Sequence, residues 1–368
     1  MFNVNSSTVF HCNLAFSFLS VHTETLEKKL AVMIWFHGGA FALGASQGID
    51  IMNSTLYDGY EIAHHGNVIV VTINYRLASL GFLSTGDENG RGNYGLWDQH
   101  MAIKWVKKNI ANFGGNPGLI TLFGESAGGA STSMHALSPV NKGLFRRVIS
   151  ESGDAQTMWA VNRRPLGAAR RVAQAVGCPL EDKAAMMFCL RRVPAKDIVL
   201  AVRVTESLSN KEILFFLPFV PTIDGEFLPH EPVKLFENSK EIDYLLGCNS
   251  GDAHLFVSIW FPGVNIPFGI SEAKFRAATE KGVGELNQNC LKFFTVLDRN
   301  KCCSRSLMGF SCSDLQIISW AKHSATITFM DLSMHEVIPF VETWRLVKFR
   351  YYKLLIDHHS EKELYNKE

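Results

Sequence analysis

Residues 124–128 read Gly-Glu-Ser-Ala-Gly, and they lie between a short apolar run and a run of small residues. The apolar run, at residues 120–123, is typical of a buried strand, and the small residues after Ser126 are compatible with a helix. Gly-x-Ser-x-Gly between a strand and a helix is the pattern of a nucleophile elbow, a sharp turn that raises the serine hydroxyl above the sheet edge. Glycines flank such a turn because neighbouring backbone passes close to it. This feature predicts an α/β fold with Ser126 at the carboxyl edge of a strand.

Further apolar runs, several rich in β-branched residues, predict the rest of a sheet. They lie at residues 32–36, 68–73, 147–150 and 244–246. Between the second of these runs and Ser126, apolar residues recur at helical spacing from Ala102 to Ile110, and Gly114 and Gly115 end that helix. Strand and helix in alternation predict a mostly parallel sheet with helices on both faces.

Composition limits the classes of function. The chain has 368 residues, of which 47% are hydrophobic, and its net charge is +1. This balance gives no indication of a nucleic-acid partner or a strongly charged substrate. No apolar run approaches the ~18 residues of a membrane span, so we expect no transmembrane segment. The apolar stretch 10–21 lacks a basic start and a small-residue cleavage site, which makes it a poor signal peptide.

A second glycine-rich segment follows the first predicted strand. His37, Gly38, Gly39 and Ala40 match the loop that supplies oxyanion-hole donors in this kind of fold. Backbone N–H groups approach a substrate oxygen only where side chains are small. The alternative for this segment alone is a plain turn after a strand.

The eight cysteines leave two readings open. Cys178 and Cys189 either form a local disulfide, which would indicate an oxidising compartment, or remain free thiols in the cytosol. The later cysteines contain no Cys-x-x-Cys pair, so we predict no metal site. Asn5 and Asn53 begin glycosylation sequences that matter only in a secreted protein.

Three long stretches carry a specific family resemblance. They are residues 66–115, 120–131 (ITLFGESAGGAS) and 219–229 (FVPTIDGEFLP). The chain resembles the type-B carboxylesterases, the family that includes the cholinesterases, from about residue 31 to 275. The resemblance implies an incomplete α/β-hydrolase over residues 31–281, with unmatched segments at 1–30 and 282–368. It implies hydrolysis of a small-molecule or lipid ester through a Ser–acid–His triad, without metal or cofactor, in a secreted protein that bile salts activate.

Individual roles follow from the same resemblance. Ser126 matches the nucleophile, and Cys178 and Cys189 match a family disulfide. Gly39, Ala40 and Ala127 match the oxyanion-hole positions. Two further matches are structural: Glu125 as a partner of the elbow, and Arg76 with Asp98 as a buried ion pair.

Asp252 is the predicted triad acid. In α/β-hydrolases the order along the chain is Ser, acid, His, and the acid follows the carboxyl end of a strand. Asp252 comes shortly after the apolar run at 244–246, whereas Asp243 precedes that run and would lie at the wrong end. A solvated loop aspartate is the alternative.

The triad histidine is not identified. His254 is too close to the acid, and no later histidine has the family's Gly-containing, acidic setting; His335, which precedes Glu336, fits least poorly. The others are His323, His358 and His359. Two explanations compete: a truncated or mis-spliced lipase, or a diverged member that lost its base. Non-catalytic adhesion or partner-binding relatives are a third alternative, but they generally lose the serine that this chain keeps.

Overall fold

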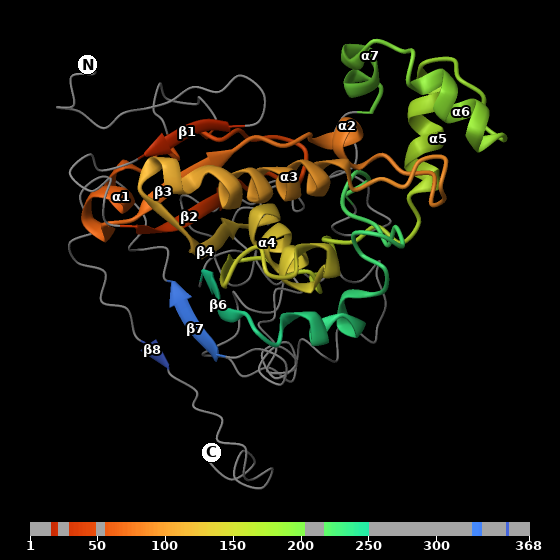
Figure 1. The fold of residues 1–368 in the computed structure, drawn as a ribbon. Helices are drawn as coiled ribbons and strands as arrows, with labels where there is room; N and C mark the ends of the chain where they lie inside the picture. The colour runs from red at the N-terminus through yellow and green to blue at the C-terminus, as the bar shows by residue number, and fades with distance from the viewer. Residues whose placement is uncertain are drawn as a thin grey trace, which may run out of the picture.

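A single mixed sheet organises the molecule in the computed structural model, which describes residues 16–20, 29–48, 56–202, 217–249, 326–332 and 351–352 (Figure 1). The strands of the described residues are β1 (Phe16–Ser20), β2 (Leu30–Phe36), β3 (Ile69–Ile73), β4 (Gly115–Glu125), β5 (Arg147–Glu151), β6 (Asp243–Asn249), β7 (Thr326–Leu332) and β8 (Tyr351–Tyr352). Their order across the sheet is β1-β3-β2-β4-β5-β6-β7-β8. Neighbours from β3 to β7 pair in parallel, and β1 and β8 add antiparallel edges.

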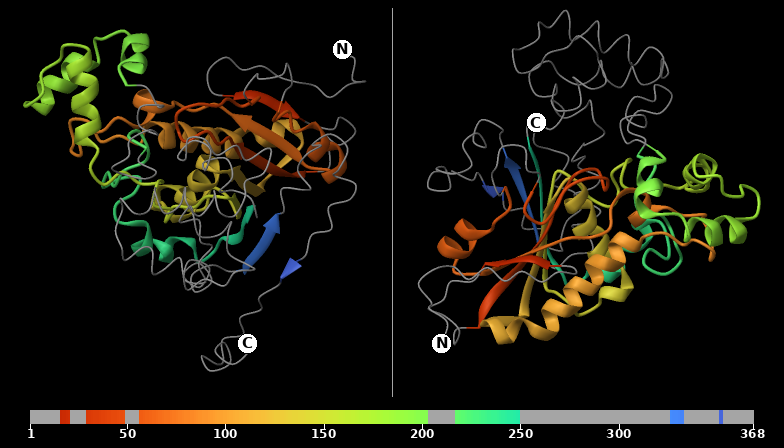
Figure 2. Two further views of the ribbon diagram at one scale, coloured as in Figure 1. Left: turned by 180° about the vertical axis from the view of Figure 1, so that it is seen from behind. Right: turned by 90° about the horizontal axis from the view of Figure 1, so that it is seen from above.

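Helices cover both faces of this sheet, as predicted (Figure 2). The described α-helices are α1 (Tyr60–Gly66), α2 (Ala78–Phe82), α3 (Tyr94–Asn109), α4 (Ala127–Leu137), α5 (Leu166–Ala175), α6 (Lys183–Leu190) and α7 (Ala195–Leu200). Successive strand residues point to opposite faces. Trp35 and Phe123 therefore pack with Ala63 of α1 on one face, while Ile34 and Leu122 join the larger core on the other face. That larger core includes buried residues of α3 and α4.

Short 3₁₀ helices link several of these elements. They are Ile110–Phe113, Pro139–Asn141, Pro232–Lys234 and Phe236–Ser239. The first of them continues α3 and ends at Gly114, whose φ of 81° is left-handed. Glycine is favoured at that position because a Cβ atom would be strained there. The predicted helix and its glycine stop are thus confirmed.

The five strands predicted from apolar runs are confirmed as β2 to β6. Strands β1, β7 and β8 lie in the segments 1–30 and 282–368, in which no strand was predicted from the sequence. β1 and β8 are edge strands, and β8 has only two residues, too few for a period of two to be recognised. The sheet therefore extends beyond the predicted core at both ends.

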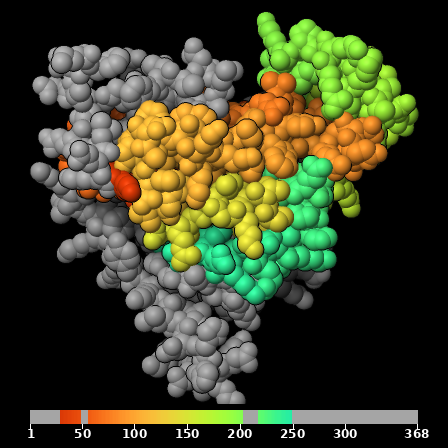
Figure 3. All heavy atoms as spheres, viewed as in Figure 1, coloured from red at the N-terminus to blue at the C-terminus, as the bar shows by residue number. Residues whose placement is uncertain are grey.

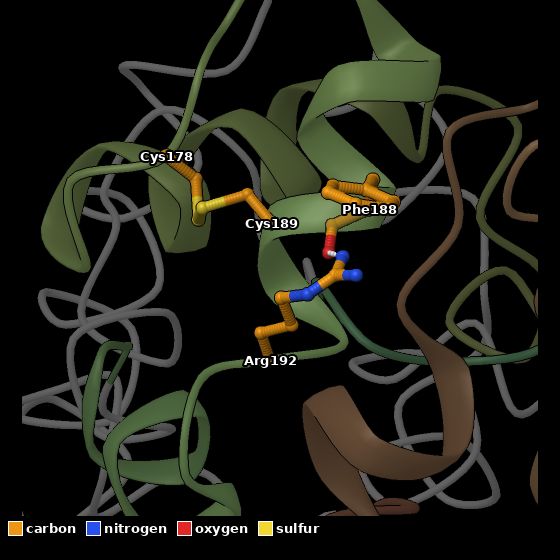
Figure 4. Close-up of a disulfide and its surroundings, with 4 residues drawn as sticks. All are labelled: Cys178, Phe188, Cys189 and Arg192. Atoms are coloured by element: carbon orange, nitrogen blue, oxygen red, sulfur yellow. Dashed lines mark hydrogen bonds between the residues drawn. A yellow bond between two sulfur atoms is a disulfide. The ribbon is translucent and has the colours of Figure 1, made fainter.

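Helices α5, α6 and α7 form a lobe at one end of the molecule, beside α2 (Figures 1 and 3). The Cys178–Cys189 disulfide joins α6 to the turn that follows α5 (Figure 4). The pairing is the one that the resemblance implies, and it excludes the reading of these two residues as free thiols. No helix among the described residues is long and apolar enough to cross a membrane.

The ion pair between Arg76 and Asp98 is present, but it is not buried. Arg76 Nε lies 2.7 Å from Asp98 Oδ2, and the two side chains are 51% and 26% exposed. The prediction of a buried pair was therefore wrong. The pair is exposed because Arg76 follows the end of β3 and meets the first turns of α3 at the surface. The pair is bidentate, since Arg76 Nη2 also donates to Asp98 Oδ1 at 2.8 Å, and at this exposure it contributes on the order of 1 kcal/mol to stability.

Candidate active site

Ser126 occupies a sharp turn between β4, which ends at Glu125, and α4, which begins at Ala127. Its backbone has φ 56° and ψ −119°, a conformation that costs a non-glycine residue on the order of 1–3 kcal/mol. Two hydrogen bonds hold the turn. The Ser126 N–H donates to the Glu151 carbonyl at 2.8 Å, and the Ser126 carbonyl accepts from the Ala130 N–H at 2.9 Å. The predicted strand–turn–helix geometry is therefore present.

Backbone crowding around the turn explains its glycines. A Cβ atom on Gly128 would lie 1.9 Å from the Phe36 carbonyl oxygen, and one on Gly124 would lie 2.6 Å from the Gly128 carbonyl carbon. On the side facing β5, a Cβ atom on Gly153 would lie 2.3 Å from the Ser126 carbonyl oxygen. The turn is thus enclosed by backbone from three elements, and only glycine fits at these positions.

The loop after β2 lies directly against Ser126. Phe36 is in register with Gly124 of β4, and a Cβ atom on Gly38 would lie 3.2 Å from Ser126 Cβ. Gly39 and Ala40 follow with φ values of 110° and 55°, so the backbone turns sharply beside the serine. Ala127 is the first residue of α4, where helix N–H groups are unpaired and the helix dipole is positive.

The side chains of His37 and Tyr75 support the loop after β2. Their rings stack with centroids 4.5 Å apart. The Tyr75 hydroxyl donates to the His37 carbonyl at 2.8 Å, and His37 Nδ1 lies 2.8 Å from the Gly38 carbonyl. Burial lowers the pKa of His37, so its ring is neutral at neutral pH. We infer that His37 shapes the loop.

Two acids beside the elbow, one half-buried and one buried, were not singled out from the sequence. Glu151 ends β5, and burial raises the pKa of its carboxyl to about 7. Asp154 is 3% exposed, and burial raises the pKa of its carboxyl to about 6 although the N–H groups of Gln156 and Thr157 act in the opposite direction. The signal available in the sequence was their position at the carboxyl end of a predicted strand, next to the strand that carries Ser126.

A hydrogen-bonded network ties α4 to β5 and β6 behind the nucleophile. Ser150 Oγ lies 2.6 Å from the Tyr244 hydroxyl and 2.8 Å from Thr132 Oγ1. The Ser150 hydroxyl also donates to the Gly129 carbonyl at 3.0 Å. Buried networks of this kind rigidify the elements they join, so the elbow has little freedom to relax.

Comparison with known proteins identifies the family. Residues 16–311 match the carboxylesterase family. The chain belongs to the carboxylesterase family. Its fold is therefore the α/β-hydrolase fold, as predicted, and Ser126 lies in the sharp turn between β4 and α4 of that fold. The match extends beyond residues 31–281 at both ends, and the division of the chain at those bounds stays a prediction.

The relatives of this chain include a lipase, a carboxylesterase and a neuroligin. Bovine bile salt-activated lipase is 54% identical over 242 residues, which are 66% of this chain and 40% of the lipase. Pig liver carboxylesterase is 38% identical over 271 residues, 71% of this chain and 46% of that protein. Human neuroligin-2 is 40% identical over 231 residues, 62% of this chain and 26% of neuroligin-2. The chain thus spans less than half the length of these relatives.

Several predicted residues lie outside the described part of the structure. They are Asp252, Asn5, Asn53 and the histidines 254, 323, 335, 358 and 359. The turn at Ser126 and the loop after β2 are therefore described, but the predicted triad acid and the candidate histidines are not. Among the described residues, no group of three or more His, Cys, Asp or Glu side chains is placed to hold a metal ion.

The Asp154 carboxyl makes stability depend on pH. Its pKa rises from 3.8 to about 6 on folding, so the folded state binds more protons than the unfolded state between these values. The Asp154 contribution to the free energy of unfolding should therefore fall as pH rises from about 4 to about 6, and then level off. Glu151, whose pKa rises to about 7, acts in the same direction up to about pH 7.

Asp154→Asn should remove the Asp154 part of this slope, leave the part due to Glu151, and raise the free energy of unfolding at pH 8 by about 2–3 kcal/mol. The amide oxygen can still accept the Gln156 N–H. Urea unfolding at pH 5 and pH 8 measures the effect. If the free energy of unfolding differed between pH 5 and pH 8 by as much in the variant as in the wild type, the assignment to Asp154 would be wrong.

Proposed function

We propose that this chain hydrolyses carboxylic esters, with Ser126 as the nucleophile. The geometry of the elbow carries the proposal. A non-glycine residue with φ 56° is maintained between a buried strand and a helix, and glycines that tolerate no Cβ atom surround it. Strain of this size persists where the surrounding structure enforces it, and it concentrates at functional turns.

The reaction runs through an acyl-enzyme. The Ser126 hydroxyl attacks the ester carbonyl carbon while a histidine takes its proton, and Asp252 orients that histidine. The N–H groups of Gly39, Ala40 and Ala127 stabilise the developing oxyanion, each worth on the order of 10²–10³ in rate. The alcohol leaves with a proton from the histidine, and water then releases the acid by the same route.

The relatives suggest the substrate class and the compartment. A bile salt-activated lipase and a liver carboxylesterase are both similar to this chain, so we propose a small-molecule or lipid ester as substrate and bile salts as activators. The Cys178–Cys189 disulfide supports an oxidising, extracellular location.

A second candidate is a carboxylesterase scaffold without turnover, either an inactive chain or a partner-binding module. The observation that favours it is in the sequence, where no histidine after Asp252 has the setting expected of the base. Such a chain would keep the turn at Ser126 and the glycine-rich loop after β2, here called the oxyanion loop, as structural features without a catalytic role.

Hydrolysis of p-nitrophenyl butyrate by the purified full chain distinguishes the two candidates. The ester hydrolase should release p-nitrophenol well above the rate in buffer, and diisopropyl fluorophosphate, which phosphorylates activated serines, should inactivate it. A chain that neither hydrolyses the ester nor becomes phosphorylated by the reagent would be the inactive scaffold, and the proposal would be wrong.

A further inference from the structure

The helical lobe exposes large apolar side chains that lie beside basic ones. Phe188 in α6 and Leu200 in α7 are 61% and 62% exposed, and Val199 is 42% exposed. Arg191, Arg192 and Lys196 are exposed between them along the chain. We call these six residues the α6–α7 face.

Helical spacing places each apolar residue near a basic one. Arg192 follows Phe188 by four residues, and its guanidinium carbon lies 3.3 Å from the centre of the Phe188 ring (Figure 4). In α7, Lys196 precedes Val199 and Leu200 by three and four residues, which is the spacing of neighbours on one side of a helix. Both helices therefore present the same combination of an apolar surface and a cation.

The basic side chains of the α6–α7 face make no ion pair with another described residue. Residues 183–200 contain four basic residues and one acidic residue, Asp197. Lys183 pairs with Asp87 at 3.1 Å, but Arg191, Arg192 and Lys196 have no carboxylate partner among the described residues. The Arg191 guanidinium instead donates to the Asn89 carbonyl at 3.1 Å, and that of Arg192 to the Phe188 carbonyl at 3.1 Å.

The lobe that bears this face is held in place on the edge of the sheet that carries Ser126. Helix α2 follows the carboxyl end of β3, and the Ser79 hydroxyl of α2 donates to the Ile198 carbonyl of α7 at 3.2 Å. The Cys178–Cys189 disulfide fixes α6 to the segment after α5. Figure 1 shows α5, α6 and α7 grouped beside α2.

We propose that the α6–α7 face docks this protein on an anionic lipid–water interface. Exposed Phe and Leu side chains gain from insertion at the boundary of headgroups and acyl chains. Arg and Lys side chains bind anionic headgroups while their aliphatic stems lie along the apolar surface. The face is positive as well as apolar, and this charge complementarity favours an anionic lipid surface over a second copy of the chain, whose identical face would be repelled. The proposal does not depend on Ser126 being reactive.

Co-sedimentation of the full chain with vesicles tests the proposal, using phosphatidylcholine vesicles with and without phosphatidylglycerol. We expect binding to vesicles that contain phosphatidylglycerol and a marked loss at high salt. Arg191→Gln with Arg192→Gln should weaken binding roughly thirtyfold, at about 1 kcal/mol for each basic residue. Phe188→Ser should weaken it about tenfold or more, because the exposed aromatic side chain that would insert at the lipid boundary is replaced by a polar one.

Matched variants on α3 control for general effects of exposed residues. Met101 is 59% exposed, and Lys104 and Lys108 are exposed on the same helix. Met101→Ser, and Lys104→Gln with Lys108→Gln, should bind vesicles like the wild type. Ser126→Ala should also bind like the wild type, which separates docking from catalysis. All replaced side chains on the α6–α7 face are exposed, so circular dichroism should show an unchanged fold.

Three outcomes would overturn the proposal. The first is no binding to anionic vesicles, and the second is equal loss of binding in the α3 controls. The third is wild-type self-association on gel filtration that Phe188→Ser abolishes while vesicle binding is unchanged, which would make the face a contact between two copies.

Discussion

Ser126→Ala is expected to lower the turnover number for p-nitrophenyl butyrate by about 10⁶-fold, because removing the nucleophile of a catalytic triad costs about as much as removing the whole triad. The oxyanion loop would remain, since Gly38, Gly39 and Ala40 are held by β2 and by the stacked rings of His37 and Tyr75. Residual catalysis of about 10³–10⁴-fold over water would then be all that is left. Initial rates at saturating ester concentration measure the effect.

The matched control is Ser138→Ala, at the other end of α4. The Ser138 hydroxyl donates to the Phe227 carbonyl at 2.5 Å, far along the helix from the elbow, and its loss should leave the turnover number within a few-fold. If Ser126→Ala kept most of the activity, or if Ser138→Ala lost as much, Ser126 would not be the nucleophile.

Gly128→Ala is expected to lower the free energy of unfolding by about 4 kcal/mol or more, a large part of the stability of an ordinary domain. The new Cβ atom would lie 1.9 Å from the Phe36 carbonyl oxygen. Phe36 belongs to β2, which is paired along its length with β4, so the carbonyl cannot move away without opening the centre of the sheet. Guanidinium unfolding followed by circular dichroism gives the change.

Gly167→Ala is the matched control for adding a methyl group. Gly167 lies inside α5, and a Cβ atom there would meet nothing within 4 Å. Alanine should therefore raise stability by roughly 0.5–1 kcal/mol through its higher helix propensity. An unfolding midpoint of Gly128→Ala equal to that of the wild type would show that the backbone around the elbow is not as closely packed as described.

The centre of the fold could be predicted because its strands are rich in apolar residues. Runs such as residues 68–73 and 120–123 are apolar apart from one threonine each, which is typical of inner parallel strands. The edges could not be predicted in this way. β8 has two residues, too few to show a period, and β1 (Phe-Ser-Phe-Leu-Ser) lacks the continuous apolar run of an inner strand.

The candidate site was predictable where chemistry requires a particular residue type. Glycine is needed at positions 124, 128 and 38 because a Cβ atom there would clash with neighbouring backbone. All three glycines belong to the motifs at residues 37–40 and 124–128, so the sequence indicates them directly. Burial depends on tertiary packing instead. Asp154 reads as an ordinary loop aspartate but is enclosed, whereas the Arg76–Asp98 pair that was expected to be buried lies at the surface.

Mass spectrometry of the acyl-enzyme tests the central claim most directly. The full chain is mixed with p-nitrophenyl acetate, quenched in acid within the first turnovers and digested, and the peptide that contains Ser126 is analysed. The account predicts an acetyl group on the Ser126 hydroxyl and none on that peptide from Ser126→Ala. Release of p-nitrophenol without acetylated Ser126, or an acetyl group on a different residue, would contradict it.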